Sequence, residues 1–267
     1  MLERLKKRLR PVAQPAAAPR FYKVSDTCQI PDLPVLYEQY FGRLKAGCFV
    51  EVGAFDGEFV SNTCGLADMG WRGYYIEPVE DSFEKCSARH AQNPATTVSQ
   101  IAIGAETKTI TLQIAGALTT SSKRMADNFR SLEWAKSMYE NSTSVDVKQI
   151  TLEEYLIDHG VAPGFHVLVI DVEGTEWNVL RNFDLSHWRP QMVIIELHDQ
   201  NPDYFLIREE CNNIVEYFYR HDYKVISKDF TNTIYVPKDR FPLAPNNKRK
   251  TPRAESGEPR KPDTSVA

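Results

Sequence analysis

Acidic side chains and one histidine end two apolar runs in the second half of the chain. Asp171 and Glu173 end the run HVLVIDVEG, and Glu196 and His198 end the run QMVIIELH. Side chains alternate along a strand, so the two residues of each pair share a face. If the runs are neighbouring parallel strands, all four side chains meet at one edge of the sheet. Such a set predicts proton transfer with the histidine as general base, or a bound divalent metal.

A bend with two glycines and two acids follows the first apolar run, in the stretch FVEVGAFDGEFVSNT. Glu51 lies two residues before Gly53, and Asp56 directly precedes Gly57. We expect Gly53 to let the backbone turn, Gly57 to let a ligand or helix approach, and a helix start beyond them to offer free N–H groups. A dinucleotide site requires Gly-x-Gly-x-x-Gly, and these acids would repel its pyrophosphate. The bend instead predicts a site for a nucleoside with an ammonium and a sulfonium group, such as S-adenosylmethionine.

A third acid, Glu77, ends the next apolar run, GYYIEP, 24 residues after Gly53. We expect it to accept hydrogen bonds from the hydroxyls of a ribose bound across the sheet edge. Acids at this offset also occur in dinucleotide-binding folds, so Glu77 alone does not separate the two classes of cofactor. The plainer alternatives are that backbone N–H groups satisfy Glu51 at a strand end and that Glu77 is an exposed charge before Pro78.

Strand and helix patterns alternate along most of the chain, which predicts an α/β fold with a parallel sheet covered by helices on both faces. The last two strands are separated only by a short turn, so we expect an antiparallel hairpin. The predicted strands are residues 47–53, 73–78, 95–104, 107–116 as an extra strand, 166–174, 191–198, 223–229 and 232–238. The predicted helices are residues 79–91, 151–159 with a capping box of Thr151 and Glu154, and 204–220.

The alternation is interrupted by residues 117–145, which are polar at first and then rich in aromatic residues. A long insert in a compact domain is usually functional or disordered, and the aromatic residues favour a partly ordered substrate lid. We divide the chain into a flexible basic segment at 1–20, a single catalytic domain at 21–239 and a disordered, basic, proline-rich tail at 240–267. The tail offers an acidic partner a weak binding site, although such tails more often aid solubility.

The composition excludes several classes of protein. A net charge of −4 gives no argument for nucleic-acid binding, and no apolar run reaches the about 18 residues of a membrane-spanning helix. The basic N-terminus lacks the apolar core of a secretory signal. The five cysteines are widely spaced and include no Cys-x-x-Cys, which argues against a disulfide framework or a zinc site and favours a reducing, cytoplasmic setting.

Five segments, taken in order, resemble the FkbM family of methyltransferases. They are FVEVGAFDGEFVSNT, GYYIEPVEDSFEKC, ITLEEYL, VLVIDVEGTEWNVLRNFD and MVIIELH, and the resemblance covers residues 47–238. The segment Asp-Val-Glu-Gly-x-Glu is the most specific, whereas the glycine bend alone would mark only a class I methyltransferase. The resemblance implies a Rossmann-like, seven-stranded, mostly parallel sheet that ends in an antiparallel hairpin. It also implies S-adenosylmethionine as donor and a hydroxyl of a sugar, glycan or other natural product as acceptor.

The site residues follow from these patterns together. The predicted cofactor-binding residues are Glu51, Gly53, Ala54, Asp56, Gly57, Glu77, Ala102 and Asp171. The predicted catalytic residues are His198 as general base, Asp171 as a contact to the methionine part of the donor or to the acceptor, and Glu173 to orient the acceptor or His198. A divalent metal held by Asp171, Glu173 and His198 is a less favoured interpretation, because mixed sets of this kind also arise by chance.

Each of these residues also has a purely structural interpretation, and there are two rival functions. In the structural interpretation, Asp171 or Glu173 only caps the helix near Thr175, and His198 only forms a hydrogen bond with a loop carbonyl. One rival function is a nicotinamide-dependent oxidoreductase on a similar sheet, against which the missing Gly-x-Gly-x-x-Gly counts. The other is a non-catalytic protein that binds the cofactor or a partner without turnover.

Overall fold

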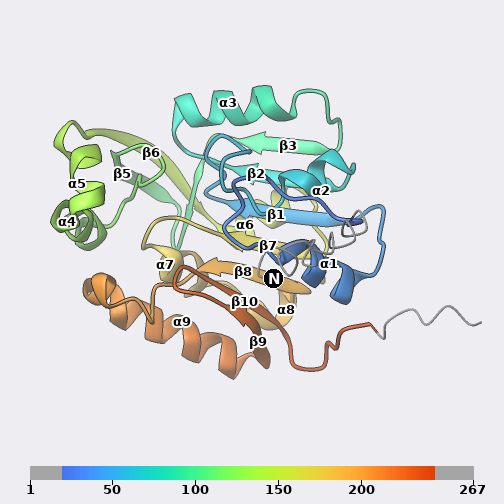
Figure 1. The fold of residues 1–267 in the computed structure, drawn as a ribbon. Helices are drawn as coiled ribbons and strands as arrows, with labels where there is room; N and C mark the ends of the chain where they lie inside the picture. The colour runs from blue at the N-terminus through green and yellow to red at the C-terminus, as the bar shows by residue number, and fades with distance from the viewer. Residues whose placement is uncertain (1–19, 244–267) are drawn as a thin grey trace, which may run out of the picture.

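The computed structural model describes residues 20–243, so the predicted basic segment at 1–19 and the tail from 244 lie outside the described residues. The described chain is a central sheet with helices on both faces and a smaller sheet beside it (Figure 1). The strands of the central sheet are β1 Cys48–Val52, β2 Arg72–Ile76, β3 Thr96–Ser99, β7 Val167–Ile170, β8 Met192–Glu196, β9 Tyr223–Lys228 and β10 Asn232–Pro237.

The central sheet has seven strands in the order β3-β2-β1-β7-β8-β10-β9. Strand β10 runs antiparallel to both β8 and β9, and every other pairing is parallel. The predicted Rossmann-like sheet with a terminal antiparallel hairpin is therefore confirmed. The chain builds outward from β1 to β3 and then returns to the other side of β1 with β7. This reversal of strand order opens a crevice at the carboxyl ends of β1 and β7.

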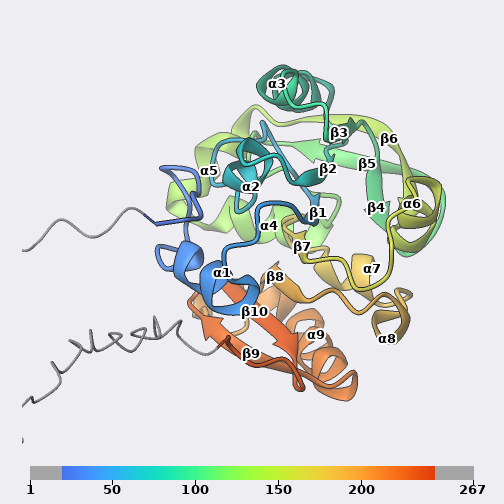
Figure 2. The ribbon, with the colours of Figure 1, turned by 90° about the vertical axis from the view of Figure 1, so that its right-hand side faces the viewer.

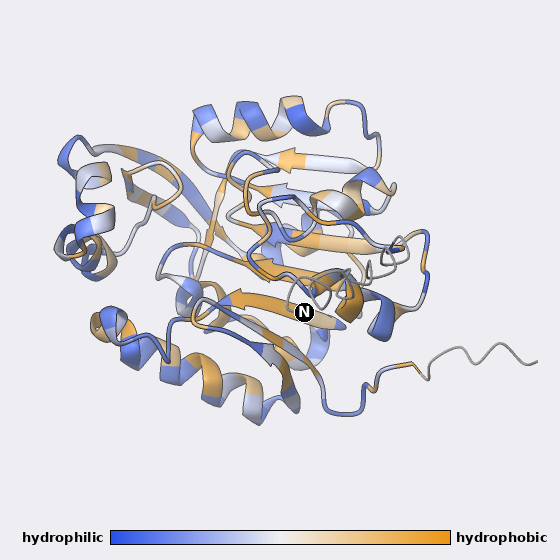
Figure 3. Cartoon of the chain, in the orientation of Figure 1, coloured by the Kyte–Doolittle hydropathy of each residue, from blue (hydrophilic) through white to orange (hydrophobic). Residues whose placement is uncertain are grey.

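Both faces of the central sheet are apolar, because each face is covered by helices. Figure 3 shows the inner strands β1, β7 and β8 as largely hydrophobic. Val50 packs into one core and Phe49 into the other, as strand alternation requires. Figure 2 shows the two helical layers. One contains α1 Leu33–Phe41, α2 Cys64–Asp68 and α3 Glu80–His90, and the other contains α6 Leu152–Asp158, α7 Glu176–Leu180, α8 Leu185–Trp188 and α9 Arg208–Arg220.

The prediction of one strand at 95–104 is wrong. The main-sheet strand ends at Ser99, whose carbonyl accepts the Glu77 N–H at 3.1 Å, and after a tight turn Ala102–Gly104 forms β4 in a second sheet. An apolar run does not specify which sheet its residues join, since both pairings bury the same side chains.

The second sheet also holds the expected extra strand and one that the sequence did not reveal. Its order is β4-β6-β5, with β5 at Lys108–Ile114 and β6 at Thr143–Thr151. Six of the nine residues of β6 are polar and only one of the nine is buried, so the apolar pattern of a strand is weak. The insert between β5 and β6 forms α4 Lys123–Ser131 and α5 Glu133–Glu140, which project beyond the carboxyl edge of the central sheet (Figure 1).

Several local features agree with the sequence patterns and two extend them. Thr151 and Glu154 form the predicted capping box, in which each side chain pairs with the backbone of the other residue. Helix α1 was not predicted, and its apolar residues pack under β1. Residues 240–243, expected in the tail, contact α1 through bonds from Arg240 to the Tyr40 carbonyl and from the Leu243 N–H to the Gln39 carbonyl. A 3-10 helix, Pro202–Ile207, precedes α9.

Each of the five cysteines is a free thiol. Across residues 20–243, none of the helices combines the length and apolar character required to cross a lipid bilayer.

Candidate active site

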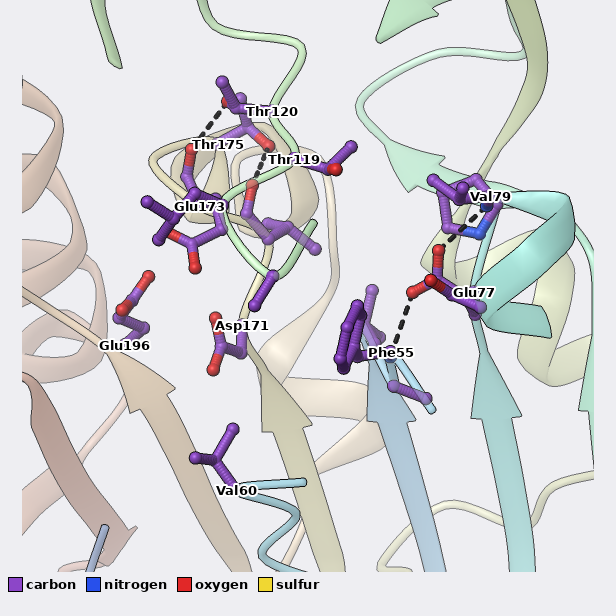
Figure 4. Close-up of a pocket in the computed structure, with 18 of the residues that line it drawn as sticks. Phe55, Val60, Glu77, Val79, Thr119, Thr120, Asp171, Glu173, Thr175 and Glu196 are labelled. Atoms are coloured by element: carbon purple, nitrogen blue, oxygen red, sulfur yellow. Dashed lines mark hydrogen bonds between the residues drawn. The ribbon is translucent and has the colours of Figure 1, made fainter. Parts of the chain in front are cut away.

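A cavity of about 570 Å³ lies at the carboxyl ends of β1, β2, β7 and β8. The acids that end these strands surround it, with Glu77 on one side and Asp171, Glu173 and Glu196 on the other (Figure 4). The strand ends converge here because the strands are parallel neighbours, as the sequence predicted. The insert closes the far side through residues such as Trp134 and Met138 of α5.

Glu51 lies at the base of the cavity and is almost fully buried. Its carboxylate accepts hydrogen bonds from the hydroxyls of Ser61, at 3.2 and 3.3 Å, and of Thr63. Burial raises the pKa of Glu51 to about 7, although both hydroxyl bonds lower it. The alternative expected backbone N–H groups to satisfy this acid; in the structure the hydroxyls of Ser61 and Thr63 are its main partners, and a backbone bond from Asn62 also lowers its pKa.

Glu77 is also buried, with 6% of its surface exposed, so the alternative of an exposed charge before Pro78 is wrong. One carboxylate oxygen accepts the Phe55 N–H at 3.0 Å and the other accepts the Val79 N–H at 2.8 Å (Figure 4). Burial raises the pKa of Glu77 to about 7 against the lowering effect of these bonds. Each oxygen keeps a second lone pair, which is available to a ligand in the cavity.

Gly53 makes the turn that the sequence required. Its φ of +86° favours glycine, and a Cβ there would lie 1.7 Å from the carbonyl oxygen of Asp171 on the neighbouring strand. Ala54 and Ala102 follow the expectation in that both line the cavity. The bend after Gly53 is strained, because Phe55 and Val60, which also line the cavity, have φ values of 49° and 52°.

Two of the predicted cofactor-binding residues, Asp56 and Gly57, do not line the cavity. Asp56 instead closes a turn by accepting the N–H groups of Glu58 and Phe59. Gly57 permits the close approach of α3, since a Cβ would lie 2.7 Å from the Cys86 sulfur. The expected helix start directly beyond Gly57 is also wrong. Residues 54–63 form a loop because Asx-type turns such as that at Asp56 compete with helix, and α2 begins only at residue 64.

The acidic side of the cavity is built from two strand ends. One oxygen from each of Asp171, Glu173 and Glu196 lies within 4.8 Å of the other two. Burial raises the pKa of all three carboxyls, and the charge of Glu196 raises those of Asp171 and Glu173 further. The pKa of Glu196 reaches about 8. The metal ligands expected from the sequence included His198, whereas the structure groups Glu196 with the two acids of the β7 end.

The loop after β7 is held by Glu176, the last acid of the Asp-Val-Glu-Gly-x-Glu segment. Glu176 is buried, and one of its oxygens accepts the N–H groups of Val172 at 3.1 Å and Gly174 at 3.0 Å. The insert also holds this loop, because the Thr120 hydroxyl donates a hydrogen bond to the Glu173 carbonyl at 2.6 Å. Glu173 itself has a φ of 53°, which turns its side chain into the cavity beside Asp171. The motif Asp-Val-Glu-Gly-x-Glu thus encodes two cavity acids and the acid that fixes their loop.

His198 lines the cavity behind Glu196 and is buried. Its Nδ1 lies 3.3 Å from the Phe230 carbonyl, an acceptor, so Nδ1 carries the proton in the neutral ring and Nε2 has a free lone pair. Nε2 lies 3.2 Å from Glu196 Oε1. The ring stacks on Tyr204 with centroids 3.7 Å apart. Burial lowers the pKa of His198, which keeps the imidazole neutral and able to accept a proton.

Sequence reasoning missed the structural importance of Glu176. It predicted that Glu196 meets Asp171, Glu173 and His198 at one edge of the sheet but did not assign Glu196 a role, because strand alternation does not give the distances between side chains of neighbouring strands. The signal for Glu176 was present in the spacing of three acids within six residues, which is unusual for a strand-to-helix junction whose acids serve only as helix caps.

Comparison with known proteins gives a family match. The family model described as the methyltransferase FkbM domain matches residues 51–225. No curated protein sequence matches at a significant level.

Solved structures show similarity of fold alone. The methyltransferase FkbM from Methylobacillus flagellatus KT is 14% identical, with a TM-score of 0.45 over 75% of this chain and 47% of that one. The bifunctional kinase-methyltransferase WbdD is 16% identical, with a TM-score of 0.42 over 89% of this chain and 46% of that one. A fibrillarin/Nop5p complex is 13% identical, with a TM-score of 0.39 over 74% of each chain. This chain spans less than half the length of the first two.

Replacement of Glu176 by alanine should lower the free energy of unfolding by about 1–3 kcal/mol, because two buried N–H groups lose their acceptor. Glu176→Gln should retain most of the stability, since its amide oxygen accepts both bonds. Urea unfolding of the two variants measures the difference. Equal losses in both would show that the charge of Glu176, rather than its hydrogen bonds, supports the loop.

The raised pKa of Glu77 predicts a pH-dependent loss of stability. In the unfolded chain the carboxyl has its usual pKa of 4.5, and in the folded chain the pKa is about 7. The unfolded chain therefore releases this proton first as the pH rises, so stability falls between the two values and then levels off. Glu77→Gln should remain neutral and become more stable relative to the wild type over that range.

Urea unfolding across this pH range, without ligand, tests the expectation. Glu84→Gln on the exposed surface of α3 is the matched control and should follow the wild type. A difference between wild type and Glu77→Gln that stays constant with pH would contradict the assignment.

Proposed function

Because this chain belongs to the FkbM family of methyltransferases, we propose that it transfers the methyl group of S-adenosylmethionine to a hydroxyl of a sugar, glycan or other natural product. The choice of methyl donor and of a hydroxyl acceptor rests on one observation. A single cavity has buried acids suited to a cationic nucleoside on one side and a buried histidine with a free lone pair on the other.

The donor fits the side of the cavity formed by β1 and β2. Glu51 provides negative charge for an ammonium and a sulfonium group, and the free lone pairs of Glu77 suit two ribose hydroxyls. The apolar walls, which include Ile103 and Val79, suit a nucleobase. A pyrophosphate would meet the same acids as repulsive charges, which disfavours the nicotinamide alternative.

The acceptor fits the side formed by β7, β8 and the insert. When bound, S-adenosylmethionine supplies an electrophilic methyl group, so most of the rate enhancement comes from alignment of the acceptor. In this proposal His198 Nε2 takes the hydroxyl proton, and the Nδ1 contact with the Phe230 carbonyl supports the tautomer that this role requires. Trp134 and Met138 form an apolar roof against which the acceptor can pack.

Donor binding is the first test of this proposal. Isothermal titration should show binding of S-adenosylmethionine and of S-adenosylhomocysteine but not of NAD, and Glu77→Ala should weaken the first two by about 1–3 kcal/mol through lost ribose hydrogen bonds. Incubation with labelled donor and a metabolite and glycan extract should then yield a labelled product. Binding of NAD in place of the donor would refute the assignment.

The His198→Asn variant tests the catalytic role. It should lower the rate of methyl transfer by about 10²–10⁴-fold while leaving donor affinity unchanged, because the histidine acts on the acceptor side. His187→Asn, at an exposed position on α8, is the matched control and should keep full activity. Undiminished transfer by His198→Asn would exclude this histidine as the base.

A further inference from the structure

Three carboxylates meet at the ends of β7 and β8, away from Glu77 (Figure 4). One oxygen from each of Asp171, Glu173 and Glu196 lies within 4.8 Å of the other two. Oxygens on opposite sides of a Mg²⁺ ion are about 4.2 Å apart, and around Ca²⁺ the separation is about 4.8 Å. The three oxygens are therefore close enough to bind one divalent ion together after small movements of their side chains.

The described residues provide no cationic side chain to balance this group. Neither a lysine nor an arginine among them forms an ion pair with Asp171, Glu173 or Glu196, and the ionic contact of Glu196 is to His198. Nearby Asp199, by contrast, is paired with Lys228. Three carboxylates without a cationic partner in a confined site carry a high electrostatic cost.

His198 gives an independent indication that a positive charge belongs here. The side chain is buried, with 5% of its surface exposed, and Nε2 has no hydrogen-bond partner among the described residues. Because Nδ1 is committed to the Phe230 carbonyl, Nε2 of the neutral ring is an acceptor, and it lies 3.2 Å from Glu196 Oε1 without a hydrogen bond between them. The other oxygen of Glu196 is also buried and unpartnered. Two facing acceptors repel each other unless a cation or a proton lies beside them.

We propose that Asp171, Glu173 and Glu196 bind one hard divalent cation, Mg²⁺ or Mn²⁺, on the acceptor side of the cavity. Oxygen ligands suit these ions, which keep several bound waters. A role in catalysis rests on the proposed methyl transfer. In that case the ion binds the acceptor oxygen and makes its hydroxyl more acidic, and His198 takes the proton as the oxygen attacks the methyl carbon and the carbon–sulfur bond breaks.

The test is a direct measurement of ion binding by the full chain after treatment with a chelator. Titration with Mn²⁺, followed by electron paramagnetic resonance, should show one ion per chain, and Mg²⁺ should compete for it. Glu173→Gln and Glu196→Gln should each weaken Mn²⁺ binding by at least about tenfold. Glu77→Gln removes a buried carboxylate from the other side of the same cavity and should bind Mn²⁺ as the wild type does.

A second measurement keeps the test decisive if a variant folds poorly. Mn²⁺ should raise the melting temperature of the wild type, since an ion that binds only the folded state stabilises it. The inference is overturned if the wild type binds neither ion, or if binding survives both glutamine substitutions. Donor binding in the separate titration reports on the proposed function, so its failure beside a functional ion site would refute the methyl-transfer assignment alone.

Discussion

The main constraint on this structure is the free energy that it costs to hold several carboxylates, away from water, in one cavity at the edge of the parallel sheet. Glu51, Glu77, Asp171, Glu173 and Glu196 all line that cavity, and burial raises the pKa of each. A water-poor site disfavours the charged form of an acid, so each must find hydrogen-bond donors, a proton or a cation. The acids of the cavity fall into two groups according to the groups that satisfy them.

On the side formed by β1 and β2, groups of the protein donate hydrogen bonds to the acids. Hydroxyls of the loop after β1 bind Glu51, and the backbone N–H groups of residues 55 and 79 bind Glu77. This geometry fixes the orientation of both carboxylates before any ligand arrives, which lowers the entropic cost of binding. On the side formed by the ends of β7 and β8, the backbone N–H groups of residues 172 and 174 donate to Glu176. They therefore do not donate to the acids that face the cavity. Asp171 and Glu173 are thereby left to a ligand.

The insert links this cavity to the second sheet. Its loop bonds the Glu173 carbonyl through Thr120, and α5 places Trp134 and Met138 over the cavity. Helix α4 packs on the same acidic loop, because a Cβ at Gly174 would lie 2.8 Å from the Met125 side chain. The insert therefore contacts both the cavity and the loop that carries Asp171 and Glu173.

The sequence by itself determined the class of fold, the strand ends that carry chemistry and the family, because apolar periodicity, glycine spacing and the Asp-Val-Glu-Gly-x-Glu segment are local properties of the chain. It did not determine that residues 95–104 serve two sheets, that β6 exists, or that Asp56 and Gly57 face away from the cavity. Only the tertiary structure showed that oxygens of Asp171, Glu173 and Glu196 lie within 4.8 Å of one another and gave Glu176 its two backbone bonds. The reason is that strand alternation fixes which face a side chain shares with its own neighbours, whereas distances across strands depend on register, loop conformation and packing.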